Sequence, residues 1–378
     1  MSNIEELIEQ LCPDGVEFRG LGELVEILDS RRKPVSKSQR VGGKYPYYGA
    51  NGIQDYVDDY IFDGTFILLG EDGSIINKDG SPVLNWAKGK IWVNNHAHIL
   101  AEKSDIAILR YVYFALAIID VTKVVKGNIP KITQQNLRGF QIPLPPLSFQ
   151  QEIVTILDKF TQLQAELQAE LEARRAQYEY YRNGLLNFEG KEVEWKTLED
   201  VCLSISAGGD VPKNYMKGQT SPSTEFPYPI FANATDVKGL YGYTDNYKIE
   251  SDAVTISARG AKIGYHTIRE AKFTTIIRLI SLIPDKHIIT TKFLNYILDM
   301  TPISGTEGGI PQLTVPTVKK IRIPIPPLAE QERIVAILDK FDKLVNDKTE
   351  GLPAEIEARR KQYEYYRGKL LDFKPLAQ

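Results

Sequence analysis

The sequence predicts an α+β protein in which two globular domains are separated by two long antiparallel coiled-coil helices, with a pseudo-twofold internal repeat. Two observations support this prediction: helical segments recur almost unchanged, and the stretches before them mix short apolar alternation with many turn residues. A chain of 378 residues also exceeds one ordinary core, since about 100–200 residues per domain is typical. We divide it into an N-terminal helical stub (1–14), a first globular domain (15–147), a first helical spacer (148–189), a second globular domain (190–328) and a second helical spacer (329–378).

Two blocks of sequence carry the repeat. Residues 142–160 (IPLPPLSFQQEIVTILDKF) recur at 323–341 with 13 of 19 positions identical, and residues 170–188 (ELEARRAQYEYYRNGLLNF) recur at 355–373 with 14 of 19 identical. The offsets are 181 and 185, so the second copy has gained four residues between the blocks. Weaker echoes extend through the globular stretches, which have diverged far more. We therefore expect the helices to share a task while the domains differ in theirs.

Both spacers have the pattern of long helices. A run of prolines up to Pro146 forbids a helix, after which Ser148 is the predicted N-cap, with Gln151 completing a capping box. Apolar residues then follow at steps of three and four for about 40 residues, which predicts a coiled-coil seam about 60 Å long. In the second copy, Gly351 and Pro353 are expected to break or kink the helix. Each helix alone could pack on its own domain, but two copies in matching phase favour mutual antiparallel packing.

Composition narrows the function classes. A net charge of −3 argues against a protein that simply coats nucleic acid, although residues 16–149 hold 16 basic and 14 acidic side chains and residues 193–328 hold 15 and 13. Cys12 and Cys202 are the only cysteines, which supports neither a disulfide framework nor a zinc quartet and indicates a reducing interior. The acidic first residues differ from a signal peptide, and the apolar stretch 107–121 is too short to span a membrane. We expect a cytoplasmic protein with no membrane partner.

The globular domains carry candidate DNA contacts. Basic side chains suit phosphates and side-chain amides reach base edges, and both kinds lie near turn signals in each domain. A solvated, mobile loop is the alternative for the basic run at residues 30–34, and from sequence alone it stays open. The candidates are Arg31, Arg32, Lys33, Lys37, Arg40, Lys44, Tyr48, Asn51, Asn94, Asn95, Lys213, Asn214, Lys217, Asn233, Arg259 and Lys262.

Sequence signatures of metal sites and of catalysis are missing. His96 and His98 form an HxH pair, but no third ligand lies near them in the sequence, so we expect a structural or DNA-contact role and no metal site. There is no phosphate loop, dinucleotide fingerprint, HExxH or CxxC, and we assign no catalytic residue. The similar turns at 127–130 and 308–311 could be packing corners or loops that approach a groove.

Tyrosines on the helices exceed what one partner helix needs. Tyr178 and Tyr181, with their counterparts Tyr363 and Tyr366, are therefore candidates for contact with another protein subunit. The neighbouring tyrosines at 180 and 365 place aromatic rings on a further face of each helix.

The repeated IPLPPLxxQ, ILDKF and EARRxQYEYYR blocks resemble the conserved helical regions of type I restriction-modification specificity subunits, over nearly the whole chain. The resemblance implies two variable target recognition domains, a bipartite double-stranded DNA target with a non-specific gap, and no chemistry in this chain. It further implies a complex with two methyltransferase subunits, which use S-adenosylmethionine for adenine N6 methylation, and with restriction subunits that use ATP and Mg²⁺. The chain itself would carry no cofactor. The four extra residues leave the gap length open.

Two other function classes compete with this interpretation. The chain could be an enzyme of undetected type, such as a fused nuclease or methyltransferase, in which case it would turn over labelled cofactor and DNA by itself. It could also be a coiled-coil scaffold with no DNA role. A scaffold would be insensitive to salt, whereas binding through phosphates weakens steeply as the salt concentration rises.

Overall fold

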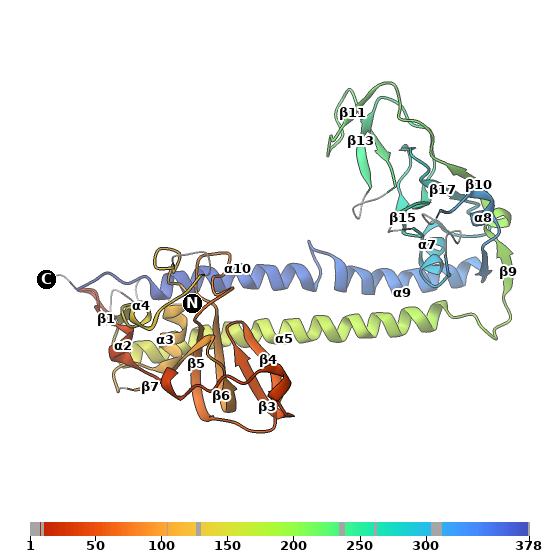
Figure 1. The fold of residues 1–378 in the computed structure, drawn as a ribbon. Helices are drawn as coiled ribbons and strands as arrows, with labels where there is room; N and C mark the ends of the chain where they lie inside the picture. Colours follow the sequence, from red (N-terminus) through yellow and green to blue (C-terminus); the bar gives the residue numbers. More distant parts are fainter. Residues whose placement is uncertain are drawn as a thin grey trace. The chain divides into compact units, whose positions relative to one another are not determined.

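A computed structural model describes residue 8 and residues 11–103, 105–125, 130–233, 239–260, 263–303 and 312–376. The predicted turns at 127–130 and 308–311, apart from Pro130, and most of the stub 1–14 lie outside these residues. The chain forms two compact units: unit 1 is Met1–Gln168 with Glu355–Gln378, and unit 2 is Ala169–Ala354. Each unit thus joins one globular domain to helical segments from both copies of the repeat (Figure 1).

Unit 1 is built on a six-stranded sheet of order β2-β7-β5-β6-β3-β4, antiparallel except where β3 runs parallel to β6. Beside it, β1 (Glu17–Gly20) pairs antiparallel with β8 (Gln141–Leu144), so the start and end of the globular domain meet. The other strands are β2 (Val25–Ile27), β3 (Gly42–Gly49), β4 (Gly52–Val57), β5 (Phe62–Gly70), β6 (Leu84–Val93) and β7 (Ala97–Glu102), and the short helices are α2 (Leu21–Leu24), α3 (Leu109–Leu116) and α4 (Gln134–Arg138).

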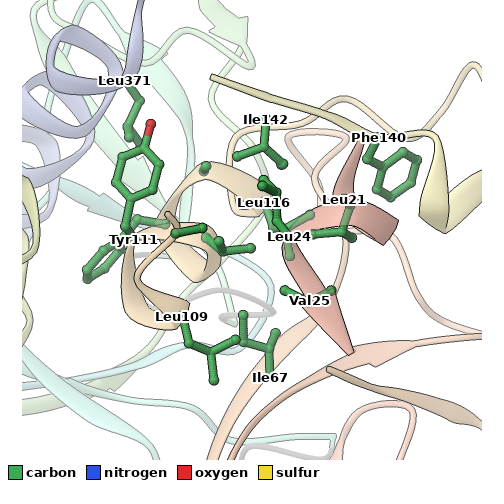
Figure 2. Packing of buried hydrophobic residues seen from close by; sticks show 14 of the residues in the cluster. Leu21, Leu24, Val25, Ile67, Leu109, Tyr111, Leu116, Phe140, Ile142 and Leu371 are labelled. Atoms are coloured by element: carbon green, nitrogen blue, oxygen red, sulfur yellow. The ribbon is translucent and has the colours of Figure 1, made fainter. Parts of the chain in front are cut away.

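The main core of unit 1 lies where the globular domain meets the two long helices. Tyr111 of α3 is fully buried and donates a hydrogen bond to the carbonyl of Pro143 at 2.8 Å. Figure 2 shows this ring among side chains of α2, β8 and α10 (Leu352–Leu371), which carries Leu371. Leu370 and Phe373 belong to the same cluster. The end of the second helical spacer is therefore part of the first domain's core.

Unit 2 divides its strands between two four-stranded sheets, of order β10-β17-β14-β15 and β11-β13-β12-β16. Its domain is closed in the same way as in unit 1, because β9 (Glu194–Thr197) pairs antiparallel with β18 (Arg322–Ile325). The remaining elements are α6 (Leu198–Val201), β10 (Cys202–Ala207), β11 (Tyr215–Lys217), β12 (Tyr228–Phe231), β13 (Leu240–Thr244), β14 (Ala253–Ile256), β15 (His266–Arg269), β16 (Thr274–Thr275), β17 (Ile280–Pro284), α7 (Thr291–Asp299) and α8 (Val315–Lys319).

The predicted α+β class and internal repeat are confirmed by this element order. In both units a closing strand pair is followed by a four-residue helix, and a buried helix, α3 or α7, precedes a five-residue helix and the return strand. Long helices then follow directly: α5 (Leu147–Leu186) after β8, and α9 (Leu328–Asn346) after β18. The described residues include no helix that is both long enough and apolar enough to cross a membrane.

Within each unit, the two helical segments pair antiparallel through aromatic rings. In unit 1, Phe160 of α5 stacks on Tyr366 of α10 at a centroid separation of 5.5 Å and contacts Tyr363 at 6.3 Å. In unit 2, the equivalent Phe341 of α9 stacks on Tyr181 of α5 at 5.5 Å. The ILDKF block of one copy therefore packs on the QYEYYR block of the other copy, which explains why both blocks are retained.

A buried glutamine ties each globular domain to its long helix. Gln150 and Gln331 are both fully buried, although glutamine is rarely found inside proteins. In unit 2, the Gln331 amide accepts from the Thr290 N–H at 2.9 Å and donates to the carbonyls of Ile288 and Pro326, both at 2.9 Å. Gln150 makes the same three bonds in unit 1. The glutamine of the IPLPPLxxQ motif thus satisfies three backbone groups at once.

The aspartate of the ILDKF block reinforces this attachment. In unit 1, Arg110 of α3 forms an ion pair with Asp158 of α5 at 2.7 Å. In unit 2, Asp339 of α9 accepts from the Tyr296 hydroxyl at 2.8 Å and pairs with Lys292, both on α7. The same helix of each globular domain is therefore held at a fixed place on its long helix.

Two expectations about the helices have different outcomes. The predicted N-cap at Ser148 is wrong, because α5 already begins at Leu147. The N–H groups of Phe149 and Gln150 donate to the carbonyl of Pro146 at 2.9 and 3.0 Å, so the last proline supplies the first acceptor. The predicted break in the second helix is confirmed between Asn346 and Leu352.

Candidate nucleic-acid interface

Unit 1 exposes a cluster of rings and lysines that we call the first aromatic–lysine patch: Lys44, Tyr45, Tyr60 and Lys90. The rings of Tyr45 and Tyr60 lie 5.1 Å apart. The Lys44 ammonium lies 5.2 Å from the Tyr45 centroid, and that of Lys90 lies 4.5 Å from the Tyr60 centroid. Both lysines are exposed. Lysines held beside half-buried rings suit a phosphate backbone, with the rings available for stacking or apolar contact.

Unit 2 has a second aromatic–lysine patch on β11 and β13: Tyr215, Lys217 and Tyr241. The two rings are 6.0 Å apart, and the Lys217 ammonium lies 5.4 Å from the Tyr241 centroid. The strand β11 is exposed along its whole length and forms an edge of its sheet. Of the predicted contacts, the structure thus brings Lys44 into the first patch and Lys217 into the second.

The basic run after residue 30 is anchored to the sheet, and three of its cations, Arg31, Lys33 and Lys37, remain exposed. The Tyr47 hydroxyl hydrogen-bonds the backbone N–H and carbonyl of Val35 at 3.1 and 3.2 Å. The Trp92 indole donates to the carbonyl of Lys33 at 2.6 Å. These bonds favour a fixed loop over a mobile one. Seven of the predicted DNA contacts in the two domains are exposed and lie outside the aromatic–lysine patches: Arg31, Lys33, Lys37, Asn51, Asn95, Lys213 and Arg259.

Several other predicted candidates use their polar groups inside the protein. Asn94 is 4% exposed, and its side chain accepts from the His96 N–H at 2.8 Å. The Arg40 guanidinium lies 4.1 Å from the Tyr47 centroid and pairs with Asp55. Arg32 pairs with Glu71, Asn214 bonds Asp245, and Asn233 bonds the carbonyl of Ile277. The Tyr48 side chain is half-buried. We leave these out of the proposed contact surface, and Lys262 lies outside the described residues.

The one described group of three possible metal ligands is a buried ion network in unit 1, made of Asp29, Glu71 and His98. His98 Nδ1 lies 2.6 Å from Asp29 Oδ2, and its Nε2 lies 2.8 Å from the carbonyl of Ile132, so both ring nitrogens have partners. Arg32 pairs with Glu71 at 2.5 Å and approaches Asp29 at 3.8 Å. Arg32 and Lys131, which pairs with Glu71 at 3.1 Å, already supply opposite charge to these carboxylates, which gives the network a structural role.

His266 of unit 2 is held in a setting that favours its charged form. Its Nδ1 faces the carbonyl of Gly264 at 3.0 Å, and its Nε2 faces the carbonyl of Asn295 at 3.1 Å and Asp299 at 3.2 Å. Burial opposes the charge, but the bonds to Asp299 and to the backbone outweigh burial and raise the pKa of His266 above its usual value.

This setting predicts a pH dependence of stability. Because the folded state binds the His266 proton more tightly than the unfolded state, the resulting stability is complete below about pH 6.5 and is lost as the pH rises through the folded pKa. We expect the urea midpoint of unit 2 to be higher at about pH 6 than at about pH 8. His266→Gln should remove that difference. If the urea midpoint of the variant still fell between about pH 6 and about pH 8 as it does in the parent, His266 would not be the source of the pH dependence.

The helix tyrosines fall into two sets. Tyr178 lies 6.2 Å from Phe341, and burial raises the pKa of Tyr178 to about 12. It and its counterpart Tyr363 therefore serve the packing inside their units. Tyr181 also stacks inside unit 2, although it remains 42% exposed. The most exposed rings are Tyr180, at 74%, and Tyr365, at 60%.

Sequence reasoning missed five members of the aromatic–lysine patches: Tyr45, Tyr60, Lys90, Tyr215 and Tyr241. Lys88 and Lys90 alternate along β6 with apolar Ala87 and Ile91, and this period of two places them on the solvent face of a strand. That signal was available in the sequence. The pairing of Tyr60 with Tyr45 was not, because it depends on how the β3 and β5 strands lie in the sheet.

Two divergent α+β domains on one repeated helical frame, each with an exposed cationic and aromatic surface, define a duplicated binding protein. The family model "Type I restriction modification DNA specificity domain" matches residues 13–173 and 190–358. A putative type I restriction enzyme specificity subunit of Haemophilus influenzae is 37% identical, over 99% of this chain and 100% of its own length. The Escherichia coli EcoR124I/EcoR124II specificity subunit is 34% identical, over 99% and 97%.

The fold agrees with these relatives. The crystal structure of a type I restriction-modification S subunit from M. genitalium superimposes with a TM-score of 0.61 at 16% identity, over 94% of this chain and 96% of that one. The chain belongs to the family of type I restriction-modification specificity subunits. It is thus a non-catalytic subunit, as the specificity subunits of this family are.

Proposed function

We propose that this subunit binds a bipartite double-stranded DNA target, one half-site per globular domain, and positions methyltransferase and restriction subunits on it. The observation that carries the proposal is the duplication itself: two domains of one fold with different exposed side chains sit on nearly identical helices. Two globular domains with different exposed side chains can recognise two different half-sites. The exposed cations of each domain supply the phosphate contacts that such binding requires.

Exchange of one recognition domain tests this proposal. The chain is produced with its methyltransferase, and the methylated adenines in DNA are mapped. Replacing residues 15–147 with the matching domain of another specificity subunit should change one half of the methylated motif and leave the other half intact. An unchanged motif would reject the proposal. The two competing classes predict otherwise: an enzyme would modify DNA without the partner, and a scaffold would show no salt-dependent DNA binding.

The exposed faces of the helices are the proposed docking sites for methyltransferase subunits. Tyr180 and Tyr365 occupy equivalent positions in the two copies and are largely exposed, so they can serve two copies of one partner. The rings of Tyr181 and Tyr366 lie beside them, and the part of each ring that does not stack on a phenylalanine is available to the same partner. Tyr180→Ala combined with Tyr365→Ala should weaken assembly without changing the half-sites. The chemistry would belong to the partners: S-adenosylmethionine for the methyltransferase, and ATP and Mg²⁺ for the restriction subunits.

The segment between α9 and α10 is expected to influence the spacing of the half-sites. Asp347 caps the turn by accepting from the N–H groups of Thr349 and Glu350, at 2.7 and 3.3 Å. These residues lie in the stretch 342–354, in which the second copy has its four extra residues. Removal of Asp347–Glu350 takes out about one helical turn and should change the gap length that methylation tolerates, or the assembly itself. Mapping methylated sites checks this, and an altered half-site sequence would refute it.

A further inference from the structure

The turn between β16 and β17 in unit 2 contains two consecutive residues in the left-handed region. Ile277 has φ of 50° and Arg278 has φ of 61°, and neither is glycine. A β-branched residue rarely adopts this conformation, because its Cβ crowds the backbone. Ile277 is nevertheless 52% exposed, and Arg278 is also exposed. No core packing accounts for these two side chains, so backbone strain is retained at a surface position.

Two backbone hydrogen bonds to Gly208 and Gly209 hold the strained turn in place. The N–H of Ile277 donates to the carbonyl of Gly209 at 3.0 Å, and that of Arg278 donates to the carbonyl of Gly208 at 3.2 Å. Gly208 must be glycine here, since a Cβ on it would lie 2.7 Å from the backbone of Thr275 and of Ile276. The surrounding backbone thus fixes the direction in which the turn presents its side chains.

One side-chain amide joins this turn to a second cation. Asn233 donates to the carbonyl of Ile277 at 2.8 Å, and its oxygen accepts from the Ala258 N–H at 3.0 Å. The next residue after each of these backbone groups is an exposed arginine, Arg278 or Arg259. Asn233 therefore holds the two backbone segments that carry these arginines close together. Among the residues described, the Arg278 side chain has no hydrogen-bond or ion-pair partner.

The first domain has a turn at the equivalent place. In unit 1 the Asn94 N–H donates to the carbonyl of Tyr48 across a parallel strand pair at 3.0 Å, and in unit 2 the Ile276 N–H donates to that of Phe231 at 2.9 Å. Asn95 thus corresponds to Ile277, and it too is exposed. Its carbonyl accepts from Arg32 at 3.3 Å, so in each domain a side chain distant in sequence, Arg32 or Asn233, bonds the turn. The same scaffold presents different chemistry in the two domains.

We propose that the Ile277–Arg278 turn is a base-reading element of the second domain, with the Arg278 guanidinium on a base edge. This inference rests on the proposed function and deepens it. A guanidinium offers two parallel N–H donors, which match the O6 and N7 acceptors of guanine in the major groove. Ile277 adds an apolar contact beside it, and Arg259 supplies charge for the neighbouring phosphate. Asn95, at the corresponding turn of the first domain, offers an amide that matches adenine instead.

The test maps methylation by the complex of the full chain with its methyltransferase, on a library of DNA targets. Arg278→Ala should reduce discrimination about tenfold or more at one or two positions of the half-site that the second domain reads. The other half-site should keep its sequence. Arg278→Gly removes the same side chain and relieves the strained backbone, so it should give the same relaxation in a chain at least as stable as the parent.

Lys272→Ala is the matched control, because Lys272 is also an exposed, non-glycine cation with positive φ, at 67°, but lies outside the turn. It should leave every position of the motif unchanged. A uniform fall in methylation at all targets after Arg278→Ala would identify a phosphate contact and overturn the inference, as would an unaltered motif. A parent complex that methylates without sequence preference would reject the proposed function itself, and the inference with it.

Discussion

Replacing Gln331 with leucine should lower the free energy of unfolding of unit 2 by about 3 kcal/mol or more. Leucine fills a similar volume but leaves the N–H of Thr290 and the carbonyls of Ile288 and Pro326 without their partner. Each of these backbone groups would be desolvated without compensation, at about 1–3 kcal/mol. The loss is large because a single side chain serves three groups.

Hydrogen exchange resolved by peptide measures this effect, since it separates the two units. Protection should fall in α7 and in the first turns of α9, while unit 1 keeps its protection. Gln150→Leu should produce the mirror result in unit 1, because its three bonds are the same. Gln162→Leu is the control: that glutamine is exposed and bonds only Glu166 on its own helix. Equal losses in all three variants would contradict the explanation.

Replacing Asp29 with alanine is the second large change, with an expected loss of about 3–5 kcal/mol in unit 1. Asp29 accepts from His98, from the Ile99 N–H and from Gln134, so its removal leaves these donors, two of them buried, without their acceptor. Burial alone would raise the pKa of this carboxyl, but the bonds from His98 and Ile99 hold it below its usual value. Stability that comes from its charge is therefore present above about pH 4 and lost as the pH falls through the folded pKa.

Chemical denaturation of both proteins over this pH range checks the prediction. The gap between parent and variant should be widest near neutral pH and should narrow in acid. Asp55→Ala is the matched control, because Asp55 also pairs with an arginine, Arg40, but is 38% exposed. It should change stability little. A gap that stays constant down to acid pH would show that the charge of Asp29 is not what stabilises unit 1.

The helices and the repeat were predictable because their signals are local and occur twice. The break before Leu352 followed from Gly351 and Pro353, and the duplicated blocks identified the family. The helix start was misplaced by two residues, since sequence rules favour a serine cap and do not show that the carbonyl of Pro146 is free to accept. The role of the two buried glutamines was also hidden, because two partners of each lie 41 to 44 residues away and the third is the carbonyl of a proline five residues earlier.

The candidate contact surface was harder to predict, for a physical reason. Arg32 and Lys33 are adjacent and both basic, yet one is buried against Glu71 while the other faces solvent. Which of them is free depends on strand register and on the position of a carboxylate distant in sequence. Residue type alone identified the exposed cations together with the internally paired ones, and it passed over Arg278, whose backbone conformation has no sequence signal.

The composition of unit 1 has a consequence for synthesis on the ribosome. Residues 169–354 are contiguous, so unit 2 has its whole core as soon as that stretch emerges. Unit 1 lacks Leu370, Leu371 and Phe373 until the last part of the chain is made, and the backbone bonds of Val16 to Lys374 and Leu376 close only then. The first domain is therefore translated before the second but completed after it, and its apolar core stays open until residues 370–376 have been made.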